Sequence, residues 1–111
     1  MDEGRDLPER AVPVAILMRF TAAEAAIYPL AMTDPDRYER AVTIVGLVLR
    51  QLRHDCTNVD ALVMGRLAAT EQATELANSE GISLAGLAPE TLADAAAALR
   101  YRELAAANEV P

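Results

Sequence analysis

The chain has 111 residues, enough for one small domain with a single hydrophobic core. Hydrophobic residues make up 52% and charged residues 24%, a balance that excludes a chain disordered throughout. The net charge of −7 argues against non-specific binding to nucleic acid or anionic membranes, and the single Cys excludes an internal disulfide.

The two ends of the chain are predicted to lie outside the folded part. Residues 1–10 carry four acidic residues and two Arg, a net charge of −2, and we expect a flexible acidic tail there. A secretory signal needs a basic start, so the expected location is the cytoplasm. A single helical domain is predicted over residues 11–107, and a frayed C-terminus over residues 108–111.

The first predicted element is a helix over residues 13–29. Proline is tolerated in the first turn of a helix, and the segment that follows, TAAEAAIY, strongly favours helix. A short strand over residues 12–20 is the alternative. The segment 11–32 is largely apolar, but Arg19 and Glu24 interrupt it, so we expect no membrane span.

The second predicted helix covers residues 35–54. Thr33 or Asp34 is expected to cap it, and Pro35 suits its first position because no backbone N–H is required there. Its middle, residues 41–49, is apolar on almost every side, which is typical of a buried helix. A buried strand over the same residues is the alternative, because β-branched residues are frequent among them.

Two further helices are predicted, over residues 58–78 and over residues 89–107. Thr57 is expected to cap the first of them, and Gly81 to end it in the left-handed conformation that glycine tolerates best. Pro89 is expected to open the second. Four helices joined by short loops predict an all-α fold, a compact antiparallel four-helix bundle.

His54, Asp55 and Cys56 are adjacent in the sequence and could carry chemistry together. A neighbouring His and Asp can lower the pKa of a Cys and make it a nucleophile. Adjacent side chains rarely point at one another, however, so we favour a structural role in which His54 meets the helix C-terminus and Cys56 packs as a small hydrophobic residue. The alternative is a reactive or ligand site at His54 and Cys56, beside a small-molecule pocket between helices.

The segment from Thr74 to Ser83 resembles the first helix and turn of a DNA-binding helix-turn-helix. It has Leu-Ala, then Gly four residues later, then an apolar residue and Ser. The resemblance implies a transcriptional regulator that binds through residues 74–92. Residues 61–90 carry one Arg and four Glu, however, and the expected second helix lacks the basic and amide side chains that contact phosphates and bases. DNA binding is therefore an alternative, and nucleic acid is not the expected partner.

The sequence contains none of the short motifs that are typical of enzyme active sites. It contains no glycine-rich phosphate loop, nucleophile elbow, paired-Cys motif or HExxH. No carboxylates stand at ligand spacing from His54 or Cys56. We therefore expect a protein that is not an enzyme and that needs no cofactor and no metal ion.

The expected function is protein binding, either as a homodimer or as a subunit or adaptor of a larger assembly. Segments 11–32 and 41–49 are more apolar than one small core requires, and surplus apolar surface usually marks an interface. We predict that the first helix provides this interface. The predicted interface residues are Val14, Ile16, Leu17, Phe20, Ile27 and Tyr28.

Overall fold

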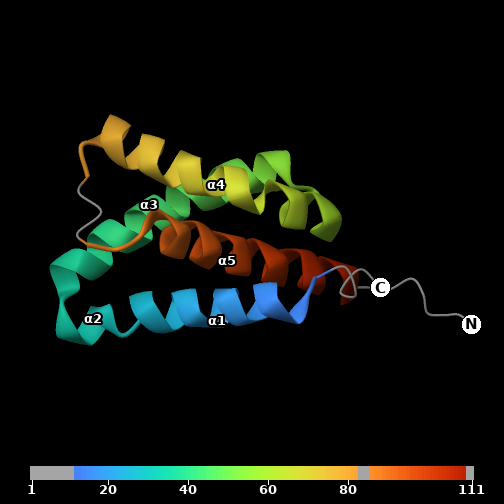
Figure 1. Cartoon of the computed structure of the whole chain (residues 1–111), viewed down its shortest axis with the longest axis horizontal. Helices are drawn as coiled ribbons and strands as arrows, with labels where there is room; N and C mark the ends of the chain where they lie inside the picture. The colour runs from blue at the N-terminus through green and yellow to red at the C-terminus, as the bar shows by residue number, and fades with distance from the viewer. Residues whose placement is uncertain (1–11, 83–85, 110–111) are drawn as a thin grey trace, which may run out of the picture.

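The computed structural model describes residues 12–82 and 86–109, and every regular element in these residues is a helix (Figure 1). Successive long helices run in opposite directions (Figure 1). The predicted all-α fold of four packed helices is confirmed, and the alternative strands over residues 12–20 and 41–49 are not formed. The elements are α1 (Val14–Ile27), α2 (Leu30–Thr33), α3 (Pro35–Asp55), α4 (Val59–Glu80) and α5 (Pro89–Glu109).

Helix α5 forms the centre of the bundle. It packs against α1, α3 and α4, and it lies between α1 and α4 in Figure 1. Helix α1 packs mainly on α5 and touches α3 little. Its buried residues are Phe20, Ala23 and Ile27, so α1 is covered by the bundle on one side only.

Small side chains allow α5 to take the central place. Seven consecutive residues, Leu92–Ala98, are buried, and seven residues of an α-helix include positions on every side. Five of the seven are Ala. Because the Ala side chain adds little width, three neighbouring helices can approach this stretch closely. The bulky residues of the core come from all four long helices, and the most deeply buried are Ile27, Ile44, Val48, Leu62 and Leu92.

The predicted ends of α3 and α4 are confirmed with one correction. The Asp34 carboxylate accepts a hydrogen bond from the Arg37 backbone N–H at 3.3 Å, which caps α3 as predicted. The cap of α4 is Asn58 and not Thr57, because Asn58 has the extended backbone of a capping residue and its side chain accepts from the Ala61 N–H at 2.8 Å. Gly81 ends α4 with φ 69°, as predicted.

Helix α2 is a short element that the sequence did not predict. Pro29 has no N–H to continue the hydrogen bonds of α1, and its ring crowds the carbonyl one turn earlier, so α1 ends at Ile27. Both Tyr28 and Pro29 keep right-handed helical backbone angles, so α2 continues α1 after this break.

Only some of the predicted domain boundaries fall within the residues that the structure describes. The expected tail, residues 1–10, lies outside them, as do residues 110 and 111 of the expected frayed end. Helix α5 extends to Glu109, two residues beyond the predicted end of the domain.

Candidate functional site

The six predicted interface residues occupy different environments on α1. Phe20 and Ile27 are buried, with exposed fractions of 5% and 0%, on the side that packs into the bundle, which removes them from the surface of the chain. Ile16 and Leu17 are partly buried against the core. The two exposed members of the set are Val14, at 70%, and Tyr28, at 39%.

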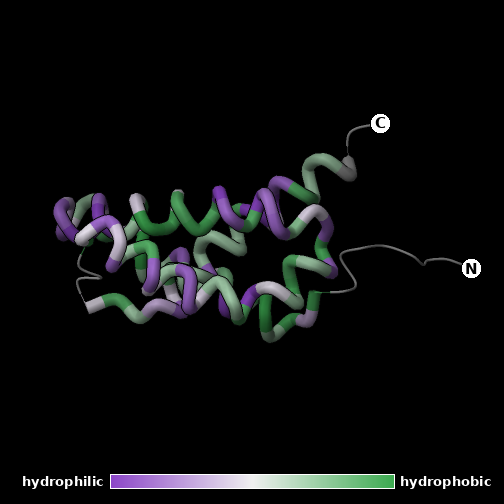
Figure 2. Tube along the Cα trace, turned by 90° about the horizontal axis from the view of Figure 1, so that it is seen from above, coloured by the Kyte–Doolittle hydropathy of each residue, from purple (hydrophilic) through white to green (hydrophobic). Residues whose placement is uncertain are grey.

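Two methionines that the sequence analysis did not select extend this exposed surface. Met18 is 66% exposed and Met32 is 88% exposed. Met18 lies four residues after Val14, and Met32 lies four residues after Tyr28, a spacing that keeps side chains on one side of a helix. The first turns of the tube after the grey N-terminal trace are mostly green, hydrophobic, in Figure 2. We define the outer face as Val14, Met18, Thr21, Ala22, Ala25, Tyr28 and Met32.

The middle of the outer face is hollowed. Small side chains stand between the larger ones, and they leave a shallow, open depression of about 370 Å³. Leu17 and Met18 form one rim of this depression. The residues that line it are Leu17, Met18, Thr21, Ala22 and Ala25.

The charged residues of α1 are turned away from the outer face. Arg19 and Glu24 are the two charged residues between Val14 and Thr33. Arg19 Nε lies 3.2 Å from Oδ2 of Asp94 on α5, and Arg102 Nη2 donates to Glu24 at 2.7 Å. This hydrogen bond raises the pKa of Arg102 above its usual value. Both ion pairs hold α1 against α5 and leave the outer face uncharged.

The apolar character of α1 and α2 also bears on whether they could cross a membrane. Among the described residues, the helical stretch Val14–Thr33 is long and apolar enough to cross a membrane, judged by length and composition alone. Only 17% of its most apolar window is buried. The same stretch, however, packs Phe20 and Ile27 into the core and pairs its two charges with α5. In this fold the stretch packs into the bundle with one side and exposes apolar side chains on the other.

A charged cluster inside the bundle joins α1, α4 and α5. Asp94 is 5% exposed, and its carboxylate meets Arg19 from α1 and Arg66 from α4, at 3.2 and 3.3 Å. The Arg66 side chain is only 15% exposed, and its Nε is buried without a hydrogen-bond partner in the described part of the chain. The pairing offsets part of the cost of burying these charges. The sequence analysis selected neither Arg66 nor Asp94 as a candidate site residue.

An open depression of about 230 Å³ lies beside this cluster, between α1 and the start of α5. Its charged groups are of both signs, and Arg19 and Asp94 pair with each other. The remaining charged lining residue is Glu90, so the depression offers a ligand one further carboxylate and no cluster of like charges. The lining residues are Arg19, Ala22, Ala23, Glu90, Thr91 and Asp94.

The structure separates the two residues of the predicted reactive site. The His54 side chain is 84% exposed, and its Nδ1 lies 2.9 Å from a carboxylate oxygen of Asp55. The pKa of Asp55 is lowered, mainly by the hydrogen bond from Gln51 and then by that from His54. Cys56 is 3% exposed. Its sulfur packs so closely on α4 that a Cβ added at Gly65 would lie 3.2 Å from it.

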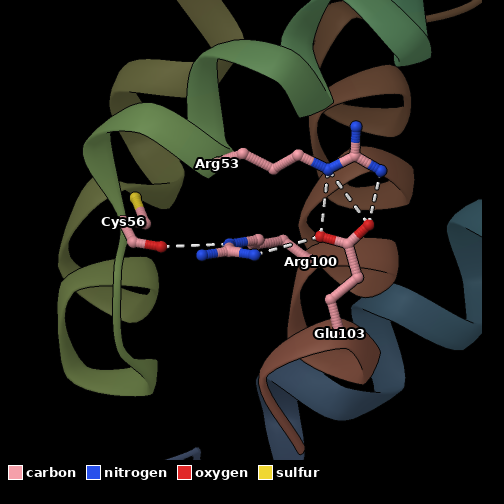
Figure 3. Close-up of polar contacts among 4 residues, drawn as sticks. All are labelled: Arg53, Cys56, Arg100 and Glu103. Carbon is pink, nitrogen blue, oxygen red and sulfur yellow. Dashed lines mark hydrogen bonds and ion pairs between the residues drawn. The ribbon is translucent and has the colours of Figure 1, made fainter. Parts of the chain in front are cut away.

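The polar contacts around Cys56 involve its backbone (Figure 3). Arg100 Nε donates to the Cys56 carbonyl at 3.0 Å, and Arg100 Nη1 donates to Glu103 at 3.1 Å. Arg53 Nε donates to the same carboxylate at 3.1 Å. Burial, followed by the charge of Asp55, raises the pKa of the Cys56 thiol. Cys56 therefore has the surroundings of a structural cysteine, and a nucleophile would need the opposite shift.

The segment that resembles a helix-turn-helix ends in the interior of the bundle. Residues 74–80 belong to α4, and residues 89–92 begin α5. Helix α5 would have to enter a DNA groove, but its residues Leu92–Ala98 are buried among three other helices. This geometry offers no support for the DNA-binding alternative.

A smaller apolar patch lies on α4. Met64 is 82% exposed and Leu67 is 69% exposed. Asp60 precedes Met64 by four residues and Glu71 follows Leu67 by four, so both acidic residues lie on the same side of α4. Both are exposed. This patch is therefore interrupted by charge, unlike the outer face of α1 and α2.

Neither a metal centre nor a known relative identifies the chain. Within residues 12–82 and 86–109, no three His, Cys, Asp or Glu side chains lie close enough together to hold a metal ion. No protein-family model, curated protein or solved structure matches the chain.

Proposed function

We propose that this chain is a non-catalytic protein-binding module that docks another protein chain on its outer face. The proposal rests on one observation: large apolar side chains are exposed along one side of α1 and α2, and no charged residue lies among them. Val14, Met18 and Met32 are 66% to 88% exposed, and Tyr28 is 39% exposed. Contiguous apolar surface of this kind in a soluble domain usually marks an interaction site.

The composition of the outer face also suits a protein partner. The cores of protein interfaces are enriched in Met and aromatic residues and depleted of charged ones. The outer face has two Met and one Tyr, and its neighbouring charges, Arg19 and Glu24, are held by α5. A binding surface with rigid support needs little ordering when the partner arrives.

Methionine oxidation tests whether the outer face is covered. Trypsin cleaves after Arg, so Met18, Met32 and Met64 fall on three different peptides and can be followed separately by mass spectrometry. We expect mild peroxide to oxidise Met18 and Met32 more slowly than Met64 in cells that produce the protein. In the purified protein at high dilution, the three should react at similar rates because all are exposed.

Met64 is the internal control, since its exposed fraction of 82% lies between those of Met18 and Met32. Equal oxidation of the three methionines in cells would contradict the proposal, because it would show an outer face that remains open to solvent.

A further inference from the structure

The sizes of the side chains along the outer face follow the same order in both directions. Val14 and Met32 lie nine residues on either side of Ala23, Met18 and Tyr28 lie five, and Thr21 and Ala25 lie two. The order of these six residues is therefore large, large, small, small, large, large, and Ala22 is the one residue of the outer face outside this pattern. The steps of four and three residues between them match the spacing of helices that pack along a seam.

From this symmetry we infer that the partner on the outer face is a second copy of the chain, with its α1 antiparallel. The inference rests on the proposed function and names the partner at that same site. A two-fold axis near the level of Ala23 would bring Met18 against Tyr28 of the partner subunit. It would also bring Val14 against Met32 of the partner subunit, so both copies use the same surface.

The small residues define the point at which the two helices cross. Thr21, Ala22 and Ala25 line the depression of about 370 Å³ on the outer face, and Leu17 and Met18 line its other end. Small side chains allow two helix backbones to approach closely, and the larger residues fill the space where crossed helices diverge. The depression lies next to the symmetry centre, where a self-complementary crossing requires it.

Electrostatics favours this surface for two copies of an acidic chain. Each chain has a net charge of −7, so two copies repel each other, and the repulsion is weakest where the contact surface itself carries no charge. Arg19 and Glu24 are paired with α5, which leaves the outer face neutral. The patch around Met64 lacks this property because Asp60 and Glu71 flank it.

The size of the surface sets the expected strength of the dimer. The stretch from Val14 to Met32 is about 27 Å long at 1.5 Å per residue. One helix face of this length buries less than the roughly 800 Å² per partner of a standard interface. We therefore expect a weak, concentration-dependent dimer.

Cysteine cross-linking tests both the partner and its direction. The variants Met18→Cys and Tyr28→Cys are made in a Cys56→Ala background and mixed under oxidising conditions. In the antiparallel dimer, a Cys at 18 faces a Cys at 28, and two Cys at 18 stand about 15 Å apart. Because Cα atoms beyond about 7 Å cannot be bridged, the mixture should give ~10-fold more disulfide dimer than either variant alone.

The control is Met64→Cys on α4, mixed with Tyr28→Cys in the same background. Cross-linking of Met18→Cys alone as efficiently as the mixture would overturn the antiparallel arrangement. If the mixture exceeds neither single variant nor the control, the second copy is the wrong partner. Protection of Met18 and Met32 from oxidation in cells, without it in concentrated purified protein, would then still support docking of a different protein.

Discussion

Helices α1 and α5 are both rich in Ala, yet they occupy opposite environments in the bundle. Helix α5 is enclosed by three helices, and seven consecutive residues of it are buried. Helix α1 has the larger apolar side chains but buries only Phe20, Ala23 and Ile27. Apolar content alone therefore does not decide which helix is central. The helix with the smaller side chains takes the centre, and some large apolar side chains of α1, such as Met18, remain exposed.

The largest expected loss of stability comes from Asp94 at the centre of the buried charge cluster, and a much smaller loss comes from Arg19 at its exposed side. Asp94→Asn leaves Arg66 buried without its counter-ion, and breaking a buried pair in this way typically costs about 3–5 kcal/mol of unfolding free energy. Arg19→Gln removes a partner that is 50% exposed and should cost less than about 1 kcal/mol. Urea unfolding measures both losses, and equal losses would contradict the difference in burial between Arg66 and Arg19.

A matched pair of Ala substitutions tests the packing difference between the helices. Ala96→Leu adds volume where α5 is fully buried and should destabilise the fold by about 1–3 kcal/mol. Ala22→Leu adds the same volume on the exposed outer face and should change stability by less than about 0.5 kcal/mol. Both are measured at dilutions where the chain is monomeric. If Ala96→Leu left the stability unchanged, α5 would be packed less tightly than its burial indicates.

The smallest expected effect concerns acid stability at the surface of α5. Hydrogen bonds from Arg53 and then Arg100 lower the pKa of Glu103 below its ordinary value of 4.5. The stability contributed by the ionised carboxylate is present at neutral pH and is lost as the pH falls from 4.5 through the lowered pKa. Glu103→Gln should therefore reduce the loss of stability in that acidic range. An unchanged acid titration of thermal stability would count against the contacts in Figure 3.

The sequence predicted the helices because their signals are local. The Asp34 cap, Pro35 and Gly81 act within a few residues, and the structure confirms each of them. The cap of α4 was misplaced by one residue because Thr57 and Asn58 are both good capping residues. The central place of α5 depends on three other helices, and no local pattern encodes it.

The candidate site was only partly predictable for the same reason. The sequence indicated an apolar first helix but not which side the bundle covers, so Phe20 and Ile27 were selected with Val14 and Tyr28. Met18 and Met32 were missed, although their spacing with Val14 was visible. Asp94 lies among Ala residues in α5, and its two arginines come from positions 75 and 28 residues away. Only the packed bundle brings these charges together.

Sedimentation velocity of three purified chains tests the central claim most directly. We predict that the wild-type chain forms a dimer at high concentration, that Met18→Asp stays monomeric with unchanged helix content, and that Met64→Asp behaves as wild type. Met64 is the matched site because it is also largely exposed, at 82% against 66% for Met18, but lies on α4. Equal sedimentation of Met18→Asp and wild type at every concentration would contradict docking of a second copy on the outer face.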